Sequence, residues 1–101
     1  MSPEDGTSEL IESVRAALRM VIDPEIGKNI VELGLVYDIR EEGEGDVTIT
    51  MTTTVRGCPA AGLLKESAAA CAEAVEGVRQ ARAILTYDPP WDPDRMASTF
   101  F

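Results

Sequence analysis

The sequence predicts a small α/β (α+β) domain with the element order α-β-β-α-β, in which helices pack on one face of a mixed three-stranded sheet. Its 101 residues are enough for one domain and no more. Two stretches carry apolar residues at helical spacing, and three others alternate apolar with polar residues. Because a helix connects the second and third strands, a parallel pairing of these two strands forms a β-α-β crossover and makes the sheet mixed.

The first helix follows a short polar stretch. Residues 1–7 are expected to form a mobile N-terminal tail, and residues 8–101 the single domain. Thr7 or Ser8 can cap the helix, and Pro24 ends it because proline forces the preceding residue out of the α region. The apolar residues of this helix form one stripe: Leu10, Ile11, Val14, Ala17, Leu18 and Val21.

Two strands joined by a glycine-containing connection predict a β-hairpin. The first strand begins at Leu35, the second covers residues 47–52, and the sequence between them is EEGEG. A third strand with weaker alternation lies within residues 78–87. The second strand also carries three alternating threonines, which we expect on a solvated or edge face: Thr48, Thr50 and Thr52.

The tripeptide Gly-Cys-Pro at residues 57–59 is the most informative motif for chemistry. Pro59 suits the first position of a second helix that runs to Glu76, so Cys58 is expected in the N-cap region. Free N–H groups, the helix dipole and the nearby Arg56 all favour the thiolate, which is the form that binds metal. The alternative is a small cap residue packed under a loop, and the spacing alone favours neither.

The second cysteine points to a structural role. Cys71 lies in the middle of the second helix among apolar residues, where free cysteine is often simply buried. Helix geometry separates it from Cys58 by roughly 18 Å, whereas a disulfide needs Cα atoms within about 7 Å. We therefore expect two free thiols.

Two further features stand outside the regular elements. Asp23 and Glu25 flank Pro24 in a loop, where carboxylates either ligate metal or cap nearby helices, and capping is the commoner use. Trp91 stands in a proline-rich tail and is expected to act as a hydrophobic plug that fixes the tail to the body.

Composition excludes several functional classes. Nine basic and eighteen acidic residues give a net charge of −9, which argues against a nucleic-acid or anionic-membrane partner. The absence of histidine excludes a histidine base and histidine metal ligands. No apolar run approaches the roughly 18 residues of a membrane span. The N-terminus does not resemble a signal peptide, so we expect a cytoplasmic protein with reduced cysteines.

Four separated motifs resemble the metal–sulfur (iron–sulfur) cluster assembly factor family, which includes SufT-like and PaaD-like domains. The motifs are VIDPEIG at 21–27, NIVELGLVY at 29–37, MTTT with GCP at 51–59, and PPWDPDRM at 89–96. The resemblance implies a small α/β fold and a role in iron–sulfur cluster assembly or delivery. It also implies that Cys58 is the functional cysteine and that the family's acidic loop corresponds to Asp23 and Glu25.

We therefore expect a non-enzymatic accessory factor that works with the iron–sulfur assembly machinery and client apo-proteins. Cys58 would be the contact thiol for a transiently held cluster or iron, with Asp23 and Glu25 shaping or completing the metal site. One thiolate cannot supply the four ligands of an ordinary cluster. The remaining ligands would come from a second protomer in a homodimer, carboxylates, a small thiol or a client. The rival is a metal-free protein-interaction adapter; a thiol enzyme is weaker, since it lacks a histidine base.

Overall fold

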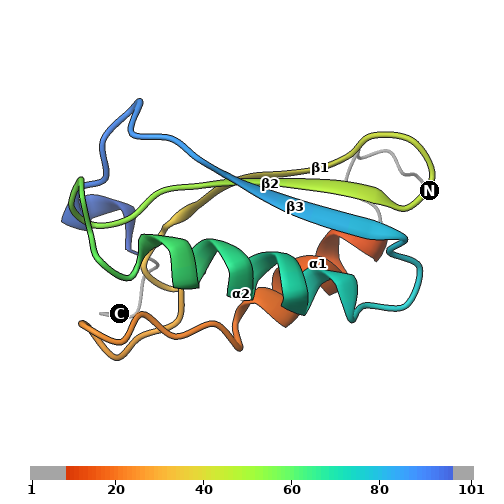
Figure 1. The fold of residues 1–101 in the computed structure, drawn as a ribbon, viewed down its shortest axis with the longest axis horizontal. Coiled ribbons are helices and arrows are strands. Elements are labelled where there is room, and N and C mark those ends of the chain that lie inside the picture. Colours follow the sequence, from red (N-terminus) through yellow and green to blue (C-terminus); the bar gives the residue numbers. More distant parts are fainter. Residues whose placement is uncertain (1–8, 97–101) are drawn as a thin grey trace.

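Two helices cover one face of a three-stranded sheet in the computed structural model, which describes residues 9–96 (Figure 1). The elements are α1 (Glu9–Leu18), β1 (Val36–Glu41), β2 (Asp46–Met51), α2 (Ala61–Glu73), β3 (Gln80–Leu85) and a short 3-10 helix, η1 (Pro93–Arg95). The predicted order and the mixed sheet are confirmed. The expected tail, residues 1–7, and the expected cap at Thr7 or Ser8 lie outside the described residues. No helix within residues 9–96 is long and apolar enough to cross a membrane.

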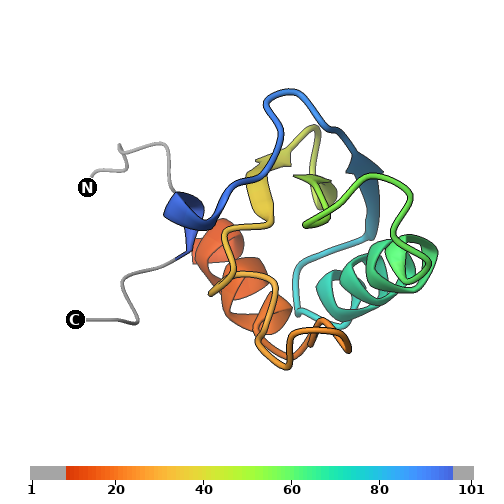
Figure 2. The ribbon, with the colours of Figure 1, turned by 90° about the vertical axis from the view of Figure 1, so that its left-hand side faces the viewer.

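The sheet has the strand order β1-β2-β3, and its pairing brings two strand ends together. β1 and β2 pair antiparallel, with Ile39 opposite Ile49. β2 and β3 pair in parallel, with Met51 opposite Leu85. Parallel strands end at the same edge of a sheet, so the segments that follow β2 and β3 leave from one end of the molecule (Figure 2).

The core lies between this sheet and the two helices. The alternation in β2 places Val47, Ile49 and Met51 inside, each at most 2% exposed. The predicted stripe of the first helix is confirmed on this side by the burial of Val14 and Leu18. The buried residues of α2 are Leu64, Ala68 and Ala72.

Helix α1 ends earlier than predicted. It stops at Leu18, well before Pro24. The residues between them are needed elsewhere, because Val21 accepts a hydrogen bond from the Ile30 N–H at 2.9 Å and Asp23 donates its N–H to Lys28 at 3.0 Å. Residues 21–23 are paired with residues 28–30 of the same loop, so the helix ends before Pro24 is reached.

The C-terminal segment is fixed to the body by aromatic side chains. The Trp91 Nε1–H donates to the Leu33 carbonyl at 2.6 Å, and the indole packs against the core. The Tyr37 hydroxyl donates to the Pro89 carbonyl at 2.9 Å, with the Arg95 guanidinium 4.9 Å from the Tyr37 ring centre. The predicted role of Trp91 as a plug is confirmed.

Candidate functional site

Cys58 lies at the end of the molecule where β2 and β3 finish. The chain leaves β2 at Met51 and reaches α2 at Ala61, so Cys58 belongs to the loop that connects them. Figure 2 looks onto this end and shows this loop near the segment that follows β3. The loop between α1 and β1, which carries Asp23 and Glu25, lies at the same end in Figure 1.

The thiol is buried ahead of the helix and does not lie at its cap. The N-cap of α2 is Ala60, which makes no side-chain capping bond, and the helix ends at Glu73. The prediction of a helix that starts at Pro59 and runs to Glu76 is therefore wrong at both ends. The Cys58 carbonyl accepts the Ala61 N–H at 3.0 Å, which forms a turn before the first helical residue. Only 6% of Cys58 is exposed, as the alternative of packing under a loop would require.

Buried polar side chains gather in the two loops at this end. Within residues 9–96 they are Asp23, Thr52 and Thr53, each at most 1% exposed. The expectation that Thr52 lies on a solvated face is wrong, because Thr52 follows β2 into the covered loop. Cys58 is also buried, at 6% exposed, so one thiol and three oxygen-bearing side chains are covered at this end.

Asp23 uses its carboxylate to shape its own loop. Its Oδ1 accepts the Glu25 N–H at 2.8 Å, and its carbonyl accepts N–H groups from Ile26 and Gly27 at 3.2 and 2.7 Å. Glu25 itself is exposed. No three Cys, Asp or Glu side chains of the described chain lie close enough to hold a metal ion. A metal site made of Cys58, Asp23 and Glu25 is therefore not assembled within one chain in this arrangement.

Three side chains that hold the Cys58 loop stand together beside β3. The Thr53 Oγ1 lies 2.8 Å from the Tyr87 hydroxyl and donates to the Val55 carbonyl at 2.6 Å. The guanidinium of Arg56, which was expected beside the thiol, lies 5.0 Å from the Tyr87 ring centre. Tyr87 was not among the predicted site residues, although the predicted parallel pairing of β2 and β3 indicates its position. Met51 is opposite Leu85, so Thr53 and Tyr87 each stand two residues past paired strand ends.

Cys71 behaves as predicted for a structural cysteine. It is half-buried on α2 and packs against the core cluster. Both cysteines are free, as expected from their separation.

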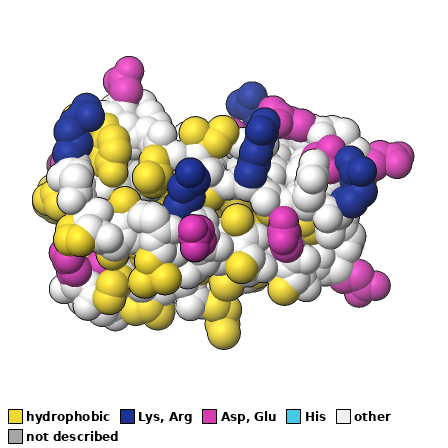
Figure 3. Space-filling view, in the orientation of Figure 1, with side chains coloured by type: hydrophobic (Ala, Val, Ile, Leu, Met, Phe, Trp, Pro, Cys, Tyr) yellow, Lys and Arg dark blue, Asp and Glu magenta, His cyan; other side chains and the backbone are white. Residues whose placement is uncertain are grey.

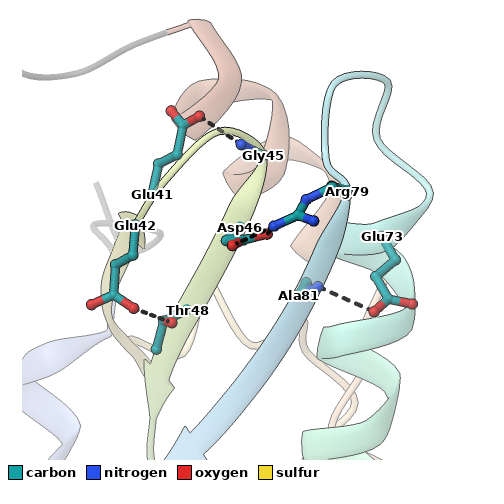
Figure 4. Close-up of polar contacts among 8 residues, drawn as sticks. All are labelled: Glu41, Glu42, Gly45, Asp46, Thr48, Glu73, Arg79 and Ala81. Atoms are coloured by element: carbon teal, nitrogen blue, oxygen red, sulfur yellow. Dashed lines mark hydrogen bonds and ion pairs between the residues drawn. The ribbon is translucent and has the colours of Figure 1, made fainter.

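The opposite end of the molecule is acidic, but its described residues include no group of three side chains that could hold a metal ion. A hollow of about 470 Å³ there is lined by residues that include Glu42, Asp46 and Glu73 (Figure 4). Glu42 accepts the Thr48 hydroxyl at 2.9 Å, and Glu73 accepts the Ala81 N–H at 3.1 Å. Asp46 is paired with Arg79 at 2.7 Å. Each carboxylate therefore already has a partner within the fold.

Comparison with known families and structures identifies the family of this chain. The model of a family described as "Iron-sulfur cluster assembly protein" matches residues 11–83, a span that contains Asp23, Glu25 and Cys58. The chain belongs to this family. The matched span stops before Tyr87 and Trp91.

Relatives whose length is similar to that of this chain have names that refer to iron–sulfur protein maturation. A protein of Porphyromonas gingivalis named "Fe-S protein maturation auxiliary factor" is 41% identical over 85% of this chain and 82% of its own length. The "Fe-S protein maturation auxiliary factor YitW" of Bacillus subtilis is 38% identical over 87% of this chain and 86% of its own length. Among solved structures, a domain of unknown function from Bacillus anthracis superimposes with a TM-score of 0.83 at 37% identity, covering 87% of this chain and 84% of the other.

Proposed function

We propose that this chain is an accessory factor in iron–sulfur cluster assembly or delivery to client proteins, with Cys58 as the contact thiol. The observation that carries the proposal is the family match over residues 11–83, which includes Cys58 and the acidic loop. The names of the relatives support an auxiliary role that is not enzymatic. The factor would work with the assembly machinery and with client apo-proteins in the cytoplasm, where reducing conditions keep both cysteines free.

The chemistry assigned to the site follows from its donor atoms. A cysteine thiolate is a soft ligand suited to iron–sulfur clusters. Asp23 holds the loop in shape through the Glu25 N–H, which leaves the exposed Glu25 carboxylate as an oxygen donor. Because no single chain gathers three such ligands among its described residues, we place the missing ligands on a second copy of the chain or on the client. The cluster or iron is cargo, held transiently.

The rival function is a protein-interaction adapter that never binds metal. Exposed apolar side chains near the start of α2 favour it: Val55 is 56% exposed and Leu63 is 60% exposed. Figure 3 shows hydrophobic side chains spread over the left and lower part of this face, where the loops and the start of α2 lie. Such a surface suits a partner protein whether or not a cluster is transferred.

Replacement of Cys58 by serine separates the two functions. Serine is close in size but its hydroxyl is a poor ligand for iron, so Cys58→Ser should fold normally. It should not restore the activity of iron–sulfur enzymes in a strain that lacks this gene. Cys71→Ser is the matched control and should restore it. If folded Cys58→Ser restores wild-type activity, the thiol is not used and the adapter function is correct.

A further inference from the structure

The loop before Cys58, residues 53–57, is held closed by a single side chain from the segment after β3. Thr53 has one hydroxyl hydrogen, and the 2.6 Å contact directs it to the Val55 carbonyl. The Tyr87 hydroxyl, 2.8 Å from the same oxygen, is therefore the donor in its contact with Thr53. Tyr87 thus fixes the beginning of the loop.

The same aromatic ring also holds the far part of the loop. The Arg56 guanidinium lies 5.0 Å from the ring centre of Tyr87, within the range of a cation–π contact. Tyr87 therefore contacts two residues of a five-residue loop, one near each end. Of the two loop residues between them, Thr54 and Val55, Val55 is 56% exposed and is open to contact from outside.

Cys58 directly follows this loop in the chain and is only 6% exposed. Loops open locally at a lower free-energy cost than the paired strands and packed helices of a fold. The strand ends at Met51 and Leu85 are paired in the sheet, and the two Tyr87 contacts join the loop to the segment beyond β3. Movement of this loop would therefore uncover the residue next to it without loss of the core.

We infer that Tyr87 is a latch that keeps the loop over Cys58 closed, and that release of this latch exposes the thiol to its partner. The functional meaning of the exposed thiol rests on the proposed function, while the latch itself does not. Tyr87 acts through the loop and is a positioning residue. A closed state protects the thiol from oxidation and chance reaction until a partner binds.

Alkylation of the native protein tests the latch, because a short pulse of neutral iodoacetamide reports how often each thiol is exposed. Tyr87→Phe removes the hydroxyl but leaves the ring beneath Arg56. We expect Cys58 to label about fivefold faster in this variant, the factor expected from loss of one hydrogen bond. Tyr37→Phe is the matched control. The Tyr37 hydroxyl donates to the Pro89 carbonyl at 2.9 Å, and the Arg95 guanidinium lies 4.9 Å from the Tyr37 ring centre. Like Tyr87, Tyr37 therefore has one hydroxyl contact and one cation–π contact, but neither is with residues 53–57.

Cys71 serves as the internal reference in the same samples. Peptide mapping should show its labelling rate unchanged in both tyrosine variants, since it responds to opening of α2. Equal Cys58 rates in Tyr87→Phe and Tyr37→Phe would overturn the latch. So would a parallel rise at Cys71, which would mean general unfolding.

Thr53 provides a second and independent pair of variants. Thr53→Ser keeps the hydroxyl and should label like the wild type. Thr53→Val loses the contacts with both Tyr87 and Val55, so it should label at least as fast as Tyr87→Phe. Fast labelling of both, or of neither, contradicts the latch. Alkylation needs neither iron nor a client. The alkylation experiment can therefore contradict the latch while the Cys58→Ser experiment supports the proposed function, and it can support the latch while the Cys58→Ser experiment contradicts that function.

Discussion

Asp23 is a buried charged residue whose structural and chemical roles can be separated by substitution. Its carboxylate is 1% exposed and accepts the Glu25 N–H at 2.8 Å. Asp23→Asn keeps an acceptor oxygen, whereas Asp23→Ala leaves that N–H without its partner. We expect Asp23→Ala to lower the free energy of unfolding by about 1–2 kcal/mol. Asp23→Asn should change it by about 0.5 kcal/mol or less. Urea denaturation followed by Trp91 fluorescence measures both.

The same pair of variants informs function. A stable Asp23→Asn that still supports iron–sulfur enzymes assigns Asp23 to loop shape alone. A stable Asp23→Asn that fails assigns its charge to the site. If both variants unfold at the wild-type urea concentration, the hydrogen bond to Glu25 contributes nothing measurable, and the structural role given to Asp23 is wrong.

At the scale of the elements, one glycine permits the C-terminal segment to dock. Gly34 has φ +76°, and a Cβ added there would meet the Arg95 carbonyl oxygen at 2.0 Å. Gly27 has a similar φ of +84° but open space around it. Both alanine variants carry the backbone cost of a left-handed conformation, about 1 kcal/mol. Only Gly34→Ala should also displace η1, and a shift of Trp91 fluorescence before unfolding reports this. Identical fluorescence in the two variants would contradict the docking.

The packing of helices and β2 into one core predicts which truncations are costly. Leu18 and Ile49 are fully buried, so replacing either with alanine should lower the free energy of unfolding by about 2–5 kcal/mol. Glu42 is an exposed hairpin residue whose bond to Thr48 is also exposed. Its replacement by alanine should change stability by about 0.5 kcal/mol or less. Denaturant midpoints in the opposite order would mean that the assigned faces are wrong.

The elements of this fold were predictable where a local pattern alone determines them. The stripe through Leu18 and the alternation around Ile49 identified the buried faces, and the helix between β2 and β3 identified the parallel pair. The end of α1 was not predictable, because pairing with a segment beyond Asp23 determines it. The contact between Tyr87 and the loop before Cys58 joins segments far apart in sequence, and no local pattern reveals such a contact.

Over the whole molecule, acidic side chains lie at both ends, but the stretch that carries Cys58 contains none. The net charge is −9, yet residues 47–65 contain no Asp or Glu and include Arg56 and Lys65. Carboxylates lie in the hairpin at the other end, including Glu42 and Asp46, and also in the loop of Asp23 and Glu25 at the Cys58 end. Figure 3 shows acidic side chains toward both ends of this face. Two copies that meet through residues 53–58 would bring no carboxylate of this loop into contact, which limits their mutual repulsion.

Anaerobic reconstitution with iron, sulfide and a small thiol tests whether two copies share a cluster. Each chain brings one thiol to the site, so two Cys58 thiolates and two small thiols complete the four ligands of a cluster. We expect visible absorption together with a sedimentation mass twice the 10.9 kDa of the chain. Cys58→Ser should stay colourless and at the single mass, while Cys71→Ser behaves like the wild type. Iron bound at the single mass would place the missing ligands outside a second copy. If the wild-type protein binds no iron, the adapter function is favoured. The exposed side chains of Val55 and Leu63 would then be part of the surface that contacts a partner protein.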